Sequence, residues 1–271
     1  MGGGNGTGST GTEGAIRHGA VPTPRFLPFG DAALIVEFGR EKDRALSAAV
    51  LALDAAVAAA KLPGITETAP SFRSLLVQFD PLATEAASIE AAILDLLPRL
   101  APGAAGQPRL WTLPACYEGP LAPDLASVAE RAGLTPAAVV DRHAAIEHHV
   151  YMIGFLPGAP YMGDLPGEID LPRRRDPRTA VPAGSVAIAV GLTVIYPFES
   201  PGGWHLIGRT PAALFGAHGA PGRPDAPVLL TPGDAVRFEP VGGAAYAAIE
   251  QAAAAGDWVP EWRPRLPQAP Q

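Results

Sequence analysis

The segment HAAIEHH at positions 143–149 concentrates side chains that can move protons or hold metals. We expect it to be helical, which places His143, Glu147 and His148 on one helix. The zinc-protease helix needs two histidines four residues apart with a glutamate directly after the first, and this spacing differs. We therefore predict no metal site. Glu147 can pair with His143 on the helix surface; alternatively, His143 points into a cleft as an acid/base or orienting residue.

A second candidate is the arginine cluster in PRRRDPRTAVPAGS, residues 172–185. Arg173, Arg174, Arg175 and Arg178 lie within six residues of a chain that is acidic overall. Guanidinium groups bind carboxylates and phosphates through paired hydrogen bonds, and the flanking prolines restrict the loop that carries them. The alternative is a solvated charged loop. We predict Arg174 and Arg178 as anion-binding catalytic residues, together with His143.

Two segments rich in glycine and proline, GFLPGAPYMGDLP (154–166) and SPGGWHLIGRTP (200–211), offer backbone control with little reactive chemistry. Such segments either cross the mouth of a barrel or bring backbone amides close to a ligand. The alternative for Trp204 is core packing. The candidate ligand-binding residues of this region are Gly154, Phe155, Pro157, Gly158, Tyr161, Tyr196, Ser200, Pro201, Gly202, Gly203, Trp204 and Arg209.

Composition limits the functions that these residues can serve. The formal charge is −7, which provides no basic surface for sequence-independent nucleic-acid binding. The single cysteine, Cys116, excludes an internal disulfide framework and is expected to be a small core residue rather than a nucleophile. No apolar run is long enough to span a membrane, and the N-terminus lacks a secretory signal. We expect a cytoplasmic protein with no membrane or nucleic-acid partner.

The hydrophobic pattern predicts where these residues sit. Residues 1–22 are rich in glycine, serine and threonine, and we expect a disordered tail. Residues 25–118 read as strand, helix, two strands around Pro70 and Ser71, helix and strand, the order of a ferredoxin-like split βαβ domain. Residues 119–150 are predicted to be a helical connection, with a helix opening at Thr135 and Pro136.

Beyond this connection the texture changes to short apolar runs separated by proline and glycine. This pattern is typical of a closed or sandwiched β domain, predicted over residues 151–250. Residues 251–271 are expected to be a C-terminal extension that frays at its end. The predicted fold class is therefore α+β.

Several ordered blocks resemble one known family. They are PACYEGPLAPDLASVAERAGLT, HHVYMIGFLPGAPYMGDLP, PRRRDPRTAVPAGSVAIA, TVIYPFESPGGWHLIGRTP and LLTPGDAVRFEPV. Together they are similar to the family of the 5-oxoprolinase B subunit (PxpB), also known as allophanate hydrolase subunit 1, carboxyltransferase domain subdomain C/D, and the sporulation-kinase inhibitor KipI. Departures from the family pattern include Ala159, Met162, Val190, Leu192 and Val194. Leu192 stands where the family has glutamine, which removes a polar group from that stretch.

This resemblance implies an N-terminal α/β domain followed by a cyclophilin-like β-barrel. It also implies an enzyme subunit, inactive alone, of an ATP-dependent 5-oxoprolinase that hydrolyses the lactam of 5-oxo-L-proline to L-glutamate. The implied partners are homologues of the C subunit (KipA-like, allophanate hydrolase subunit 2) and of the A subunit (LamB/YcsF-like). ATP with Mg is used by the complex and could be bound by a partner, and no biotin is attached to this chain.

Two alternatives from other classes follow from the same family. The first is an inhibitor of a sensor histidine kinase, which requires a surface patch for a helix bundle. The second is the carboxyltransferase half-domain of a urea carboxylase/allophanate hydrolase system, disfavoured because the chain has no biotin-carrier segment of its own.

Overall fold

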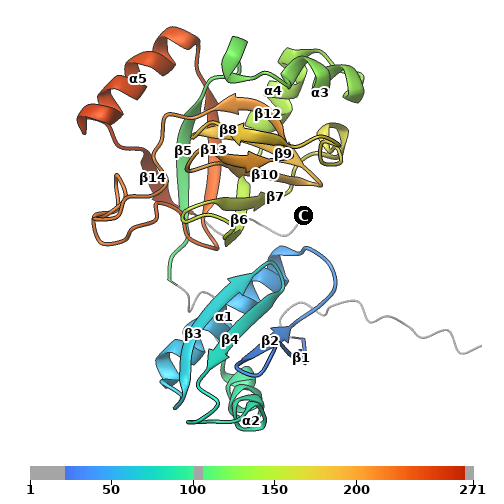
Figure 1. Ribbon diagram of the computed structural model, residues 1–271, viewed down its shortest axis with the longest axis vertical. Coiled ribbons are helices and arrows are strands. Elements are labelled where there is room, and N and C mark those ends of the chain that lie inside the picture. The colour runs from blue at the N-terminus through green and yellow to red at the C-terminus, as the bar shows by residue number, and fades with distance from the viewer. Residues whose placement is uncertain (1–21, 101–105, 266–271) are drawn as a thin grey trace, which may run out of the picture.

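The computed structural model describes residues 22–100 and 106–265, which form two units stacked along the long axis (Figure 1). The predicted tail, residues 1–22, lies outside the described residues except for its last residue. The fold is mixed α/β with more than one sheet, which confirms the predicted class at this level.

The N-terminal unit is an antiparallel sheet covered by helices. Its elements are β1 (Arg25–Pro28), β2 (Ala33–Glu37), α1 (Arg44–Ala60), β3 (Ile65–Ser71), β4 (Ser74–Phe79), α2 (Ala86–Leu96) and a 3₁₀ turn, η1 (Leu97–Arg99). The sheet order is β1-β2-β4-β3. Burial alternates along β2 and β4, so one face of each strand meets the apolar residues of α1 and α2 in a single core. Asp43 caps α1 by accepting hydrogen bonds from the N–H groups of Ala45 and Leu46.

The prediction that a strand at 109–118 completes the N-terminal domain is wrong. This strand, β5 (Arg109–Ala115), pairs in parallel with β13 (Ala235–Pro240) and antiparallel with β14 (Glu261–Pro264) in the second unit. Its run of buried residues on both faces, including Trp111 and Leu113, suits an interior strand. The sheet position beside β2 is filled instead by β1, which pairs with β2 as a hairpin.

The C-terminal unit is built around an eight-stranded sheet of order β12-β9-β10-β7-β6-β13-β5-β14, and a separate pair, β11-β8. Its further elements are η2 (Gly119–Leu121), α3 (Leu125–Ala132), α4 (Pro136–Ala144), β6 (His148–Ile153), β7 (Pro160–Gly163), η3 (Gly167–Ile169), β8 (Arg178–Val181), β9 (Ser185–Ala189), β10 (Leu192–Ile195), β11 (Ser200–Gly202), β12 (His205–Arg209) and α5 (Gly243–Ala255). The ladder does not close into a continuous barrel, because β12 reaches β5 only through one bridge between Arg209 and Cys116. The cyclophilin-like comparison stays a prediction.

The predicted helix through residue 151 is also wrong. After the Thr135 cap, α4 ends at Ala144, and His148 begins strand β6, which pairs with β13 and β7. Long-range pairing therefore overrides local helix propensity in this stretch. Glu147 is consequently not a helical neighbour of His143 and instead pairs with Arg237. Helix α5, rich in alanine, was not predicted.

Both faces of β9, β10 and β12 are buried, against two different clusters. Val186 and Ile188 of β9 belong to the large core of the unit, whereas Ala187 and Ala189 belong to a smaller core. The smaller core also contains Val181, Val194, Tyr196, Trp204 and Leu206. This second core lies on the sheet face opposite the main core.

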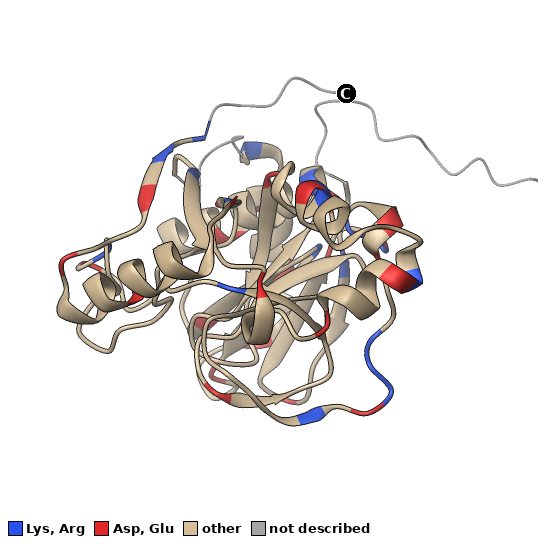
Figure 2. Cartoon of the chain, turned by 90° about the horizontal axis from the view of Figure 1, so that it is seen from above, with Lys and Arg blue, Asp and Glu red and all other residues tan. Residues whose placement is uncertain are grey.

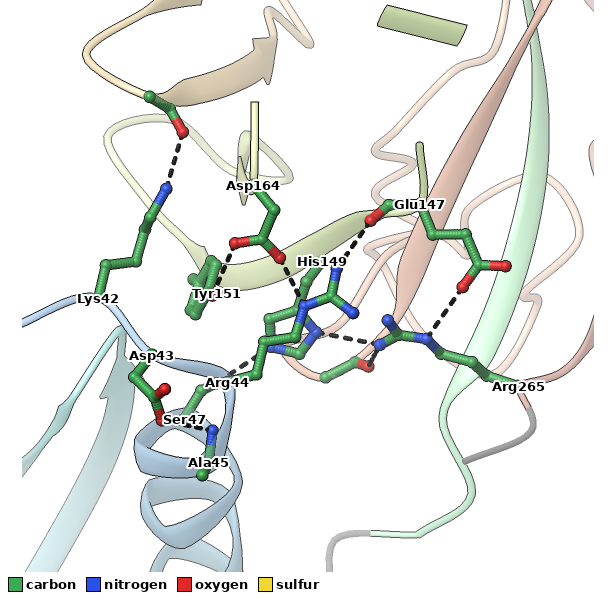
Figure 3. Close-up of polar contacts among 12 residues, drawn as sticks. Lys42, Asp43, Arg44, Ala45, Ser47, Glu147, His149, Tyr151, Asp164 and Arg265 are labelled. Atoms are coloured by element: carbon green, nitrogen blue, oxygen red, sulfur yellow. Dashed lines mark hydrogen bonds and ion pairs between the residues drawn. The ribbon is translucent and has the colours of Figure 1, made fainter. Parts of the chain in front are cut away.

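Polar side chains join the two units (Figure 3). At the start of α1, Arg44 pairs with Asp164, and the Ser47 hydroxyl lies 3.2 Å from Nε2 of His149. Arg265 donates to Nδ1 of His149 at 3.1 Å. Because Nδ1 accepts this bond, His149 is neutral and carries its proton on Nε2. Burial lowers the pKa of His149 to about 3, and the nearby Arg265 charge acts in the same direction.

Candidate functional site

A cavity of about 240 Å³ opens beside the smaller core. Its volume is below the ~300–1,000 Å³ of sites that hold drug-sized ligands, so it suits a small molecule. The residues that line it are Phe155, Leu156, Ala159, Tyr161, Arg173, Val194, Ile195, Tyr196, Pro201, Gly202, Gly203 and Trp204. The lining is aromatic and apolar, with one charged side chain.

Strands from both sheets position this lining. Tyr161 comes from β7 and Val194 from β10, which pair directly in the large sheet. Gly202 comes from β11 of the small sheet, where it pairs with Arg178 of β8. The cavity therefore combines side chains of the large sheet with backbone of the small one. The two prolines and three glycines of residues 200–211 serve this close approach of backbone to the cavity.

Trp204, Tyr161 and Arg173 form a stack at the cavity. The Trp204 ring is only 5% exposed and meets the ring of Tyr161 edge-on at a centroid distance of 6.0 Å. The guanidinium of Arg173 lies over the Trp204 ring, 5.6 Å from its centroid. Trp204 thus belongs to the smaller core and to the cavity wall at once, so both interpretations made for it from sequence apply.

Tyr196 and Gly202 are in close contact. A Cβ atom at Gly202 would lie 2.4 Å from the Tyr196 hydroxyl oxygen, so only glycine leaves room for this ring. Burial raises the pKa of Tyr196 to about 12, and burial also raises the pKa of Tyr161. Both hydroxyls are therefore protonated at neutral pH and can donate as well as accept hydrogen bonds.

Arg174 and Arg178 do not face this cavity. Arg178 makes a two-pronged contact with the carboxylate of Asp124, at 2.9 and 2.8 Å, and Arg174 adds a third bond at 3.2 Å. Asp124 also accepts from the backbone N–H of Leu206 at 2.7 Å. Burial opposes ionisation of Asp124, yet the bonds from Arg178 and Leu206 hold its pKa below the usual value. The anion predicted for these arginines is thus supplied by the chain itself.

His143 is fully buried and also lies away from the cavity. Its Nδ1 is 2.9 Å from the Tyr117 hydroxyl, and its Nε2 is 3.2 Å from the Thr193 hydroxyl. Burial holds the pKa of His143 well below its usual range, and the neighbouring His148 acts in the same direction. These contacts support a role in the core and do not support the predicted acid/base role.

The remaining predicted residues surround the cavity without lining it. Gly154, Pro157 and Gly158 shape the loop that carries Phe155; Gly158 has a φ of +80° and abuts the Leu214 carbonyl. Ser200 is buried, and within the described ranges its hydroxyl has no hydrogen-bond partner. Arg209 pairs through its backbone with Cys116, a buried core residue as expected.

Sequence reasoning missed five lining residues: Leu156, Ala159, Arg173, Val194 and Ile195. Two of them, Ala159 and Val194, are departures from the family pattern, and this signal was available in the sequence. Arg173 belongs to the predicted cluster, but its neighbours were preferred as site residues. Nothing in the local sequence separates the three arginines, because their difference is decided by a residue about 50 positions away, Asp124.

Charge and metal-binding groups outside the cavity show no concentration. In Figure 2 the acidic and basic residues of the described chain are interspersed along the ribbon. Across residues 22–100 and 106–265, no cluster of three or more His, Cys, Asp or Glu side chains is arranged to hold a metal ion. Within these same ranges, no helix has both the length and the apolar character needed to cross a membrane.

Comparison with known proteins places this fold and cavity in a class. The family model described as carboxyltransferase domain, subdomain C and D, matches residues 24–224, which include every residue that lines the cavity. The chain belongs to this carboxyltransferase-domain family.

More particular relatives carry one name. The 5-oxoprolinase B subunit of Bacillus subtilis (strain 168) is 36% identical over 232 residues, which cover 82% of this chain and 95% of the relative. The resemblance to the family of the 5-oxoprolinase B subunit is thereby confirmed.

Solved structures extend the comparison. The crystal structure of TTHA0988 matches with a TM-score of 0.68 and 34% identity, covering 78% of this chain and 40% of that protein. The urea amidolyase of K. lactis matches with a TM-score of 0.73 over 90% of this chain and 16% of the enzyme. Its identity of 21% shows a shared fold only. The chain therefore spans well under half of either solved protein.

Proposed function

We propose that this chain is the B subunit of an ATP-dependent 5-oxoprolinase, acting with the A and C subunits to convert 5-oxo-L-proline to L-glutamate in the cytoplasm. The observation that carries the proposal is the 36% identity to a 5-oxoprolinase B subunit over 95% of that protein's length. The blocks 154–161 and 194–204, which supply all of the cavity lining except Arg173, lie within the resemblance.

The cavity contributes binding and orientation. Its aromatic and apolar side chains exclude water, while Arg173 and the two tyrosine hydroxyls provide polar contacts. A lactam is a poor electrophile, so a phosphorylated lactam oxygen gives water a better target. In this proposal the chain holds the small substrate, and the activating chemistry is completed with its partners.

The lining does not fit a nucleotide. A triphosphate is held in enzymes by several cationic or backbone donors with a metal ion, whereas this lining presents one guanidinium. In this proposal, ATP and its Mg are therefore bound by a partner.

The test is reconstitution. The chain is purified with and without homologues of the A and C subunits from its own genome, and glutamate formation from 5-oxoproline is measured with ATP. We expect turnover only from the full set, with no turnover when ATP or any one of the three proteins is omitted. Absence of glutamate formation by a correctly assembled full set would contradict the proposal.

A further inference from the structure

Arg173 differs from its neighbours in having no anionic partner. Within residues 22–100 and 106–265, Arg173 makes no ion pair or side-chain hydrogen bond, and its one recorded contact is with the Trp204 ring. It is also the one charged side chain that lines the cavity in this part of the chain. A guanidinium that stacks on a ring keeps its in-plane N–H donors free. These donors face a ligand with no competing carboxylate from the described lining.

The stack also fixes the position of this charge. Trp204 is 5% exposed, is packed in the smaller core and contacts Tyr161. Because the ring that supports it cannot move freely, the Arg173 guanidinium loses less conformational freedom on binding an anion than a solvated arginine would. One positive charge with two parallel donors matches a single carboxylate.

Two neutral hydroxyls complete the polar surface. Tyr161 and Tyr196 both line the cavity, and neither hydroxyl has a hydrogen-bond partner among the described residues. A secondary amide needs one donor for its carbonyl and one acceptor for its N–H, and protonated tyrosines offer both. Val194 and Ala159 supply apolar surface for methylene groups.

We propose that this cavity is a subsite for a small cyclic amide that carries one carboxylate, with Arg173 binding the carboxylate and Tyr161 and Tyr196 contacting the amide. The proposal deepens and rests on the proposed function, since 5-oxoproline has this chemistry. It assigns Arg173, rather than Arg174 or Arg178, as the residue that determines specificity for an acid.

The first experiment measures binding to the isolated chain by calorimetry. The ligands are 5-oxo-L-proline, 2-pyrrolidinone, which is the same lactam without the carboxylate, and ATP. The variants are Arg173→Met, which keeps an apolar stem over Trp204, and the matched control Arg175→Met, an exposed arginine of the same loop outside the lining.

We expect 5-oxoproline to bind at least tenfold more weakly to Arg173→Met, while Arg175→Met binds as the unaltered chain does. We expect 2-pyrrolidinone to bind weakly and equally to all three proteins, and ATP to bind none of them. An equal loss of both lactams in Arg173→Met, or the same loss in Arg175→Met, would overturn the assignment of Arg173 to the carboxylate.

A second measurement uses the assembled complex and separates the two proposals. If the complex hydrolyses 5-oxoproline and Arg173→Met leaves its KM unchanged, the subsite is wrong and the proposed function stands. If the complex has no such activity but the chain binds 5-oxoproline in an Arg173-dependent way, the subsite stands and the function is wrong. Failure of the isolated chain to bind, joined to an unchanged KM in the complex, also overturns the subsite.

Discussion

Arg173 and Arg178 lie five positions apart in one loop, yet their guanidinium groups have opposite surroundings. Arg178 is closed on the buried carboxylate of Asp124, which Arg174 and the backbone of Leu206 also contact. Arg173 stacks on Trp204 beside a cavity and has no carboxylate partner in the described chain. The first arrangement satisfies its own charges, and the second leaves donors available.

The same contrast separates the other polar groups of this unit. His143 is enclosed with both ring nitrogens in contact with hydroxyls, whereas Tyr161 and Tyr196 present their hydroxyls to the cavity. A buried polar group whose partners are all within the chain stabilises the fold. A polar group at a cavity without such partners is available to a ligand. Satisfaction of hydrogen bonds, more than residue type, therefore distinguishes the core from the candidate site.

The largest expected effect comes from opening the closed arrangement. Replacing Asp124 with alanine leaves Arg174 and Arg178 partly buried without their anion and leaves the N–H of Leu206 unpaired. Breaking a buried ion pair from one side costs about 3–5 kcal/mol. We expect the free energy of unfolding, measured by urea denaturation, to fall by about this amount.

The matched control is Arg173→Met, because the open arginine has no ion pair to lose. We expect its free energy of unfolding to stay within about 0.5 kcal/mol of the unaltered chain. Equal destabilisation by the two substitutions would erase the distinction between the closed and the open arginines.

An intermediate effect is expected from acid, at the enclosed histidine between the two units. His149 accepts from Arg265 in its neutral form, and burial lowers its pKa to about 3 from an ordinary value of 6.5. The unfolded chain therefore binds a proton between these pH values that the folded chain does not. Stability contributed by neutral His149 is complete above about pH 6.5 and is lost as the pH falls toward 3.

The measurement compares the unaltered chain with His149→Gln, by urea denaturation at pH 7 and pH 5. We expect the unaltered chain to lose about 1–2 kcal/mol more than the variant over this interval. The other charged groups at this contact, Arg44, Asp164 and Glu147, are present in both proteins and cancel in the difference. Identical losses would show that His149 is not held neutral by the fold.

The smallest expected effect concerns the shape of the cavity. Gly202→Ala places a methyl carbon 2.4 Å from the Tyr196 hydroxyl oxygen, so the ring must move. Gly203→Ala is the matched control, because its nearest neighbour, a carbon of Pro177, would lie at an ordinary 3.5 Å. We expect calorimetric affinity for 5-oxoproline to fall about tenfold, or ~1.4 kcal/mol, in Gly202→Ala. Affinities that agree for both variants would argue against Tyr196 as a ligand contact.

The part of the site that is local in sequence was predictable. SPGGW required a close backbone approach, and Gly202, Gly203 and Trp204 do line the cavity. The arginine assignment failed because the partner that distinguishes Arg178 from Arg173 lies on another element, at Asp124. Spacing along a loop cannot reveal a carboxylate that tertiary packing brings to it.

The fold shows the same division between local and long-range information. Alternating burial predicted β2 and β4, and the Thr135-Pro136 start predicted the beginning of α4. The membership of β5 in the large sheet depends on β13 and β14, which lie more than 100 residues later in the chain. Helix α5 was detectable from its alanine content and from Gly256, which ends it with a φ of +81°, but these signals were overlooked.

The most direct test of the open site is a crystal structure of this chain with 5-oxo-L-proline. The account predicts the ligand in the cavity beside Trp204, with its carboxylate oxygens about 3 Å from the Arg173 guanidinium nitrogens, and with Asp124 still bound to Arg174 and Arg178. A ligand bound at Arg174 or Arg178 in place of Asp124, with the cavity at Arg173 empty, would contradict it.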